Sequence, residues 1–215
     1  MTARIFDAQQ MTAQEIGQIA HALDNGAVAI FPTDTVYGIG CGAFCPQAVE
    51  KIYTLKQRPA TQPLQILVSG WEQAKQVAEF SASAQRLART FWPGALTLIV
   101  PPNDEGRPLL HGAKGLGLRV PAYTTLLKIL QNMKNPLCAT SANLHGQPVL
   151  TEEESLEDFF GAQVDIIIKG GTLSPVASSV VDLMEENNPR LLREGSILQA
   201  ELEQVLGTVF VRKEL

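Results

Sequence analysis

Residues 27–38, Ala-Val-Ala-Ile-Phe-Pro-Thr-Asp-Thr-Val-Tyr-Gly, join the two features that decide the fold, an apolar strand and the polar loop that it feeds. The apolar run 27–31 is typical of a strand buried on both faces, and Pro32 ends it. Two threonine hydroxyls, the Asp34 carboxylate and nearby glycines follow at once. Strand ends that feed polar loops are where α/β folds bind ligands, although ordinary turn chemistry explains this loop equally well when it is taken alone.

Outward from this strand, helical and strand patterns interleave along the chain. Thr12 and Glu15 form a capping-box signature that opens a helix, and Gly26 closes that helix. Further helices are predicted over 46–55, 83–91, 124–133, 151–160 (with a second capping box at 151–154) and 198–206, and further strands over 64–68, 95–100, 116–120, 137–140, 165–168 and 180–183. The order is not a strict βαβ alternation. It predicts one α/β (α+β) domain over 1–215, with a twisted mixed sheet, flanking helices and a C-terminal tail at 208–215.

Composition narrows the class of protein. The 215 residues carry a net charge of −5, and 18% of them are charged, which argues against disorder. The acidic balance disfavours broad contact with DNA phosphates. The sequence shows neither an apolar run long enough for a membrane span nor a secretory start. We therefore expect a globular cytoplasmic protein.

Cysteine and histidine spacing argues against a protein-bound metal. The chain has Cys41, Cys45 and Cys138, and its histidines are His21, His111 and His145. These residues share no ligand spacing, so we expect reduced thiols and no structural metal site.

Three further polar patches follow predicted strands or stand in loops. They contain Lys56 and Arg58, then Ser141 and Asn143, then Ser178 with Arg193. Closely spaced cations suit phosphate oxygens, but a solvated surface pair is the commoner fate of lysine and arginine. No phosphate-binding P-loop and no dinucleotide fingerprint occurs. A nucleotide site here would therefore need a less common architecture.

Taken in order, seven motifs resemble those of the YrdC/TsaC family of threonylcarbamoyl-AMP synthases, from about residue 10 to residue 200. The motifs are Pro32-Thr-Asp-Thr-Val-Tyr-Gly38, Lys56-x-Arg58-Pro59, Trp92-Pro-Gly-Ala-Leu-Thr97, Arg119-Val-Pro121, Thr140-Ser-Ala-Asn143, Ser178-Ser-Val-Val-Asp182 and Leu192-Arg-Glu-Gly195. The resemblance implies a twisted α/β fold with a large, positively lined concave cavity. It also implies that L-threonine, bicarbonate or CO2, and ATP yield threonylcarbamoyl-AMP and pyrophosphate, for N6-threonylcarbamoyladenosine at position 37 of tRNA.

The resemblance also assigns roles to residues. The implied threonine ligands are Thr35, Arg119, Ala139 and Ser178, and the implied ATP ligands are Lys56, Arg58, Gln62, Ser141, Asn143, Val149 and Arg193. Lys56 and Arg58 would act on the phosphates as the catalytic pair, and Mg2+ would arrive with ATP rather than on a protein cluster. The implied partners are proteins that transfer the threonylcarbamoyl group to tRNA, and we expect a monomer, with a dimer as the alternative.

Four positions differ from the residues that the family usually has. Gln62 stands in place of asparagine, Leu67 and Tyr123 in place of histidines, and Gly115 in place of a hydroxyl residue. Because the histidine at position 67 contacts threonine in relatives, Leu67 bears on threonine affinity and on the choice of amino acid.

Two alternative functions remain open for a chain of this kind. A protein of this fold could bind double-stranded RNA or tRNA, or bind a nucleotide without turnover. With 6% aromatic residues, the chain shows no evident platform for stacking bases.

Residues 103–115 contain many of the turn-forming residues of the chain and are predicted to form a mobile loop that acts as a lid over the site.

Overall fold

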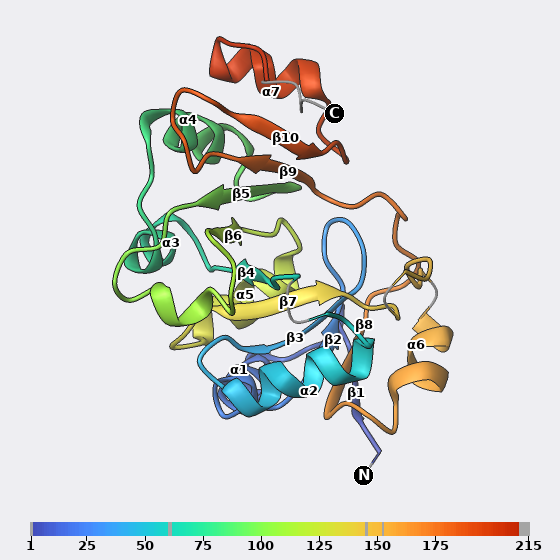
Figure 1. The fold of residues 1–215 in the computed structure, drawn as a ribbon. Helices are drawn as coiled ribbons and strands as arrows, with labels where there is room; N and C mark the ends of the chain where they lie inside the picture. The colour runs from blue at the N-terminus through green and yellow to red at the C-terminus, as the bar shows by residue number, and fades with distance from the viewer. Residues whose placement is uncertain (1, 60–61, 145, 152, 211–215) are drawn as a thin grey trace.

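The computed structural model describes residues 2–59, 62–144, 146–151 and 153–210. Its ten strands form one mixed sheet in the order β1-β8-β2-β3-β7-β4-β6-β5-β9-β10 (Figure 1). The strands are β1 (Arg4–Asp7), β2 (Ala29–Phe31), β3 (Gly38–Gly42), β4 (Gln65–Leu67), β5 (Leu96–Val100), β6 (Leu116–Arg119), β7 (Leu137–Ser141), β8 (Ile166–Lys169), β9 (Ser179–Asp182) and β10 (Arg190–Arg193). The helices are α1 (Ala13–Asp24), α2 (Pro46–Lys56), α3 (Trp71–Val77), α4 (Ala82–Phe91), α5 (Thr124–Asn132), α6 (Glu153–Phe160) and α7 (Gln199–Leu206). The predicted α/β class with a mixed sheet and flanking helices is confirmed.

Parallel and antiparallel pairs alternate irregularly across the sheet. β8 runs parallel to both β1 and β2, while β3 and β7 are antiparallel to each other and to their outer neighbours. In the other half, β6 is parallel to β4 and antiparallel to β5. This sheet therefore brings β4, β6 and β7 to its middle, between strands that lie far from them in the sequence.

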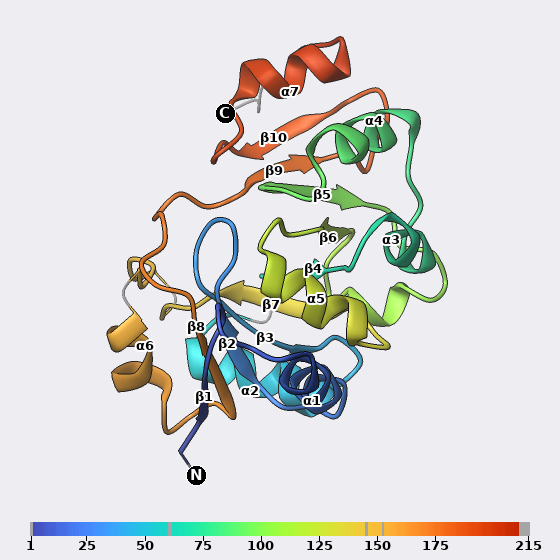
Figure 2. The same ribbon diagram turned by 180° about the vertical axis from the view of Figure 1, so that it is seen from behind.

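Alternate side chains of the central strands enter two separate cores. In β2, Ile30 packs with the apolar side chains beneath α2, whereas Ala29 and Phe31 pack with those of α1 and α5. Figure 2 shows α1 and α5 on the face of the sheet opposite to α2. Because β2 is covered on both faces, its run of apolar residues is continuous rather than alternating.

The first helix forms as its sequence predicts. Thr12 caps α1 by accepting from the backbone N–H of Glu15, whose carboxylate accepts in return from the backbone N–H of Thr12. Gly26 follows the helix with φ of +89°, a conformation that favours glycine. The local sequence alone determines both ends of this helix.

The sequence prediction missed four elements: β1, β3, β10 and α3. In β3, Gly38 and Gly40 lower the strand propensity, which is why it was interpreted as part of a loop. The structure shows why glycine is needed there. A Cβ at Gly38 would lie 2.7 Å from the Phe31 ring, and one at Gly40 would lie 2.5 Å from the Cys138 carbonyl oxygen.

The prediction of a mobile lid at 103–115 is wrong in this structure. The Asn103 side chain donates to the backbone of α3, residues 107–109 form a 3-10 turn, and Leu109 is buried in the core. A Cβ on Gly106 would overlap the Val77 carbonyl oxygen, so the segment packs tightly against the end of α3. Tertiary packing therefore overrides the loop-like composition.

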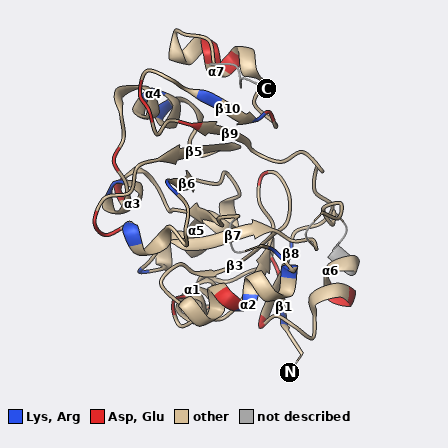
Figure 3. Ribbon diagram, viewed as in Figure 1, with Lys and Arg blue, Asp and Glu red and all other residues tan. Residues whose placement is uncertain are grey.

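Several other predictions concern the ends of the chain and its charged groups. The predicted capping box at 151–154 and the end of the tail at 208–215 lie outside the described residues. Within the part of the chain that the structure describes, no helix is both long and apolar enough to cross a membrane. Basic and acidic positions are interspersed along the ribbon (Figure 3).

Candidate functional site

One face of five adjacent strands, β7-β4-β6-β5-β9, forms the floor of a cavity of about 470 Å³. Residues two apart on a strand share a face, and the floor residues follow this spacing: Ala139 and Ser141, Gly117 and Arg119, Thr97 and Ile99. Several floor residues are small, which leaves room above the sheet. The volume lies within the range of small-molecule sites.

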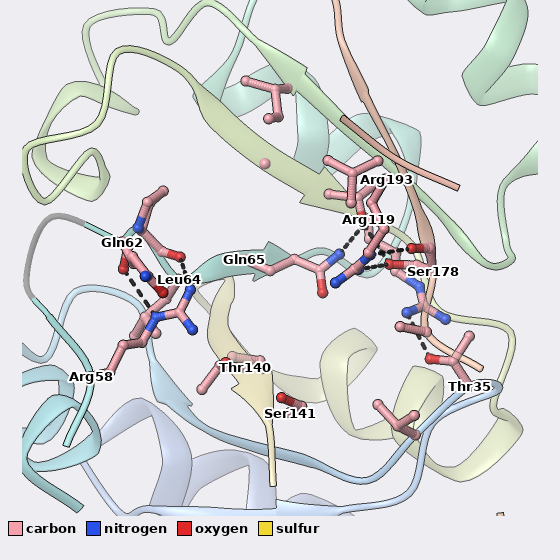
Figure 4. A pocket seen from close by; sticks show the side chains of 18 of the residues that line it. Thr35, Arg58, Gln62, Leu64, Gln65, Arg119, Thr140, Ser141, Ser178 and Arg193 are labelled. Carbon is pink, nitrogen blue, oxygen red and sulfur yellow. Dashed lines mark hydrogen bonds between the residues drawn. The ribbon is translucent and has the colours of Figure 1, made fainter. Parts of the chain in front are cut away.

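Nine of the eleven predicted site residues line this cavity. They are Thr35, Arg58, Gln62, Arg119, Ala139, Ser141, Val149, Ser178 and Arg193. They come from loops and strands spread over most of the chain, and Figure 4 shows Arg58 with Gln62 at one end and Arg119, Arg193 and Ser178 at the other. The two predicted residues that do not line it are Lys56 and Asn143.

Arg119 is a buried guanidinium held by three groups. It donates to the Asp34 carboxylate at 2.7 Å, to the Thr35 hydroxyl at 3.0 Å and to the Gly94 carbonyl at 2.9 Å. Asp34 also accepts from the backbone N–H of Ala122 at 2.9 Å. A guanidinium has five N–H donors, so these contacts fix the fork and leave donors for a ligand.

A chain of hydroxyl and amide contacts crosses the floor beside Arg119. The Gln65 amide donates to the Thr97 hydroxyl, which lies 2.9 Å from the Ser178 hydroxyl. Arg193 donates to the Ser178 carbonyl at 2.9 Å and to its hydroxyl at 3.1 Å. These contacts join β4 and β5 to Ser178, the residue before β9, and to the end of β10 at this end of the cavity (Figure 4).

At the other end, Arg58 is anchored to the loop that follows α2. Its Nε donates to the Gln62 carbonyl at 3.1 Å and its Nη2 to the Pro63 carbonyl at 3.1 Å. The Tyr53 hydroxyl donates to the same Gln62 carbonyl at 3.1 Å. The guanidinium is therefore oriented while it remains at the cavity surface.

Lys56 is neither a surface cation nor part of the cavity wall. Its side chain is 1% exposed, and its ammonium donates to the Ser141 carbonyl, to the Asn143 carbonyl at 2.6 Å and to Asn143 Oδ1 at 3.0 Å. Asn143 Oδ1 also accepts from the Ser141 hydroxyl at 2.5 Å. Lys56 and Asn143 therefore hold the turn that carries Ser141. The burial of Lys56 contradicts the alternative of a solvated surface cation, and its contact with the phosphates stays a prediction.

The cavity is electropositive. Burial lowers the pKa of Arg58, Arg119 and Arg193 from the ordinary value, and the charge of Arg119 lowers that of Arg193 further, whereas Asp34 raises that of Arg119. All three remain charged at neutral pH. No aspartate or glutamate is among the described lining residues, so the site favours an anionic ligand.

The structure explains two of the four positions that differ from the residues usual in the family. A Cβ at Gly115 would overlap the Met184 thioether, so glycine makes room for that side chain. Leu67 is buried among the apolar residues beneath α1 and α5, and it borders a small recess that also touches Gln65 and Arg119. The Tyr123 ring is half-buried against the same core.

The sequence interpretation overlooked Gln65, Thr97 and Gly117 as site residues. Thr97 ends one of the quoted motifs, but residues 95–100 were predicted only as a strand, with no role in the site. Small residues on the floor face of these strands, Gly117 in β6 and Ala139 and Ser141 in β7, were the signal for a hollow floor. Gln65 gave no signal, because a lone glutamine at a strand start is common on surfaces.

Gly117 provides a direct test of the cavity. We expect Gly117→Leu to reduce the affinity for any ligand of the cavity at least about tenfold, because the side chain would project into it. Its Cβ would meet only ordinary contacts, the nearest being Thr97 Cγ2 at 3.5 Å, so the fold should persist. Ligand titration and thermal unfolding measure the two effects. Gly17→Leu on α1, whose Cβ meets nothing within 4 Å, is the matched control, and equal affinity in both variants would contradict the site.

Fold and site together define an α/β protein with a cavity on the face of its sheet whose arginine-rich lining suits an anionic small molecule. The family model described as "Telomere recombination" (Sua5_yciO_yrdC) matches residues 21–195. The chain belongs to this Sua5/YciO/YrdC family, and the predicted resemblance is confirmed.

Several relatives resemble the chain over most of its length. A "Threonylcarbamoyl-AMP synthase" of Pyrococcus abyssi is 37% identical, over 97% of this chain and 62% of the relative. One of Vibrio vulnificus is 31% identical, over 83% of this chain and 97% of the relative. The chain thus spans less than two thirds of the archaeal protein.

Two solved structures have the same fold as this chain. P. abyssi Sua5 complexed with L-threonine superimposes with a TM-score of 0.90 at 34% identity, over 98% of this chain and 63% of that one. E. coli YciO gives a TM-score of 0.82 at 27% identity, over 90% of this chain and 96% of that one.

Proposed function

We propose that the protein is a threonylcarbamoyl-AMP synthase, which forms threonylcarbamoyl-AMP and pyrophosphate from L-threonine, bicarbonate or CO2, and ATP. The observation that carries the proposal is the cavity itself, in which three arginines converge without an acidic side chain among the described lining residues. Both the triphosphate and the amino-acid carboxylate are anions that guanidinium forks bind well. The names of relatives that align with most of this chain support the same activity.

The two ends of the cavity suit the two organic substrates. Arg119, Thr35 and Ser178 would hold the amino acid by its carboxylate and hydroxyl, and Ala139 lies beside them on the floor. At the other end, Arg58, Gln62, Ser141 and Val149 would hold the nucleotide. Arg193, which lies at the Arg119 end, would contact the part of the nucleotide that extends toward the amino acid. A single cavity then places the amine of one substrate close to the α-phosphate of the other.

The reaction needs positioning and charge neutralisation rather than a protein nucleophile. The neutral amine of threonine adds to CO2 and loses a proton, which gives a carbamate. A carbamate oxygen then attacks the α-phosphorus, its bond to the pyrophosphate oxygen breaks, and pyrophosphate leaves. Fixed guanidinium groups stabilise the charge that develops on the phosphates at no cost in reorganisation, and a shared cavity supplies proximity.

Other components would come from outside the chain. Mg2+ would enter as part of the ATP substrate, since phosphate oxygens and water are its preferred ligands. Partner proteins would transfer the threonylcarbamoyl group to tRNA. Cytoplasmic location, a monomeric or dimeric state and weak binding of tRNA or double-stranded RNA by this chain stay predictions.

Pyrophosphate release tests the activity. We expect the purified protein to release pyrophosphate from ATP and Mg2+ only when L-threonine and bicarbonate are both present. Release that is independent of threonine would contradict the proposal, and so would no release from a protein shown to bind ATP.

Arg58 should matter mainly for the nucleotide. We expect Arg58→Ala to reduce turnover about 100-fold and to raise the KM for ATP more than that for threonine, because a charged fork at the nucleotide end is lost. Stability should change little, since this side chain is half-buried and its partners are backbone carbonyls of a surface loop. Steady-state kinetics with each substrate varied would measure this. Arg190→Ala, an exposed arginine of β10, is the control, and a wild-type rate in Arg58→Ala would remove Arg58 from the mechanism.

A further inference from the structure

The cavity offers many hydrogen-bond donors and few acceptors. Its arginines only donate, and its described lining residues include no carboxylate. The oxygens of three of the five lining hydroxyls already meet a guanidinium or an amide, namely those of Thr35, Thr97 and Ser178, and the other two belong to Thr140 and Ser141 of β7. An amino acid brings a carboxylate, which this cavity binds readily, and also an amine, which needs an acceptor to receive its N–H groups.

Gln65 supplies an acceptor at the end of the cavity occupied by Arg119. Its side chain extends from β4 across the floor toward Arg119 and Ser178 (Figure 4). The Nε2 group donates to the Thr97 hydroxyl, which in turn is held by Ser178 at 2.9 Å. This contact fixes the amide plane, and among the described residues none donates to Oε1. Gln65 Oε1 is therefore an oriented acceptor inside the cavity.

The other lining amide does not compete for this role. Gln62 lies at the opposite end, where its backbone carbonyl anchors Arg58 (Figure 4). Asp34 lies closer to Arg119, but its Oδ1 accepts from Arg119 and from the backbone of Ala122, and it does not line the cavity. The residue two further along β4 on the same face is Leu67, which is apolar and buried. The acceptor at this end is thus placed on Gln65.

We infer that Gln65 Oε1 accepts a hydrogen bond from the amine of the amino-acid substrate, so that Gln65 selects α-amino acids against acids that lack the amine. This inference rests on the proposed function. A carbonyl acceptor binds the neutral amine through its N–H and leaves the nitrogen lone pair free to react. The guanidinium groups of Arg119 and Arg193, which lie at this end of the cavity, oppose a further positive charge, and this favours the neutral amine.

Two ligands that differ only in the amine test the inference. L-Threonine and (R)-3-hydroxybutanoate share the carboxylate, the methyl group and the hydroxyl configuration. We would titrate the wild-type protein and Gln65→Met with each ligand by NMR, which measures weak dissociation constants. We expect Gln65→Met to raise the dissociation constant of L-threonine about 10-fold, which is the effect of losing one hydrogen bond to an amine. The dissociation constant of 3-hydroxybutanoate should not change.

Two further variants separate this role from a structural one. Gln65→Glu keeps the acceptor oxygens and loses the donor to Thr97, so it should discriminate between the two ligands at least as well as the wild type. Gln62→Met, the same change at the other end, should leave the affinity ratio of the two ligands unaltered. A loss of discrimination in Gln65→Glu equal to that in Gln65→Met would overturn the inference, because the Thr97 contact would then be what matters.

The outcomes also distinguish this inference from the proposed function. If the wild-type protein binds L-threonine and Gln65→Met weakens both ligands equally, or neither, the inference fails and the synthase proposal stands. If the wild-type protein binds no L-threonine at all, the proposed function fails and the inference fails with it.

Discussion

Arg119→Ala is expected to raise the threonine concentration needed for half-maximal rate about 100-fold or more, with a much smaller change for ATP. The guanidinium fork would be lost from the amino-acid carboxylate, and each hydrogen bond to a charged group contributes about 1.5–3 kcal/mol. The free energy of unfolding should also fall by about 3 kcal/mol, because Asp34 would lose the partner of its ion pair. Kinetics with each substrate varied, together with urea unfolding, would measure both effects.

Arg119→Lys provides the control for charge alone. Lysine keeps a cation beside Asp34 but has no planar fork, so it should recover most of the stability and little of the threonine affinity. An unchanged threonine dependence in Arg119→Ala would show that the amino acid binds elsewhere in the cavity.

Lys56→Met is expected to abolish most of the turnover, by about 100-fold or more, while also reducing the free energy of unfolding by about 3 kcal/mol. The ammonium donates to three acceptors of the 141–143 turn, and the buried turn would lose all three of these charge-assisted hydrogen bonds. Ser141 would then lose its fixed position at the nucleotide end. Wild-type stability combined with lost activity would contradict this, and would favour a direct phosphate contact instead.

The same lysine predicts a pH dependence of stability. Burial, and secondarily the charge of Arg58, lower the pKa of Lys56 from its ordinary value of 10.5 to about 8. Below pH 8 both folded and unfolded chains carry the proton, and the cost of burying the charge is fully present. Between about 8 and 10.5 the unfolded chain holds more protons, so the free energy of unfolding rises with pH relative to Lys56→Met. Urea unfolding of the wild type and of Lys56→Met below and above pH 8 would measure this rise. A difference in the free energy of unfolding between the two proteins that stays constant with pH would contradict the lowered pKa.

Local signals in the sequence predicted those parts of the fold whose causes are local. The α1 capping box and Gly26 lie within the helix that they bound, and the apolar run of β2 needs no more than burial on both faces. Strand β3 was missed because glycine disfavours strands in general. Here glycine is required by the Phe31 ring and the Cys138 carbonyl, which only the folded sheet brings near.

In the site, too, some residues could be predicted from the local sequence and others depend on distant parts of the chain. The motif residues that line the cavity could be named from the sequence because their types suit anions and their order matches a family. The burial of Lys56 could not be predicted from the sequence, because its partner Ser141 lies 85 residues away in the chain. Gln65 was missed for the same reason, because its role depends on Thr97, 32 residues further on.

The most direct test of the synthase proposal is product formation from isotopically labelled bicarbonate. The purified protein would be incubated with ATP, Mg2+, L-threonine and the label, and its products separated and identified by mass spectrometry. We predict threonylcarbamoyl-AMP that carries the label in its carbamate carbon, absent when threonine is omitted and strongly reduced in Arg58→Ala. An adenylate without the label, or no adenylate from a protein that binds both ATP and threonine, would contradict the proposed function.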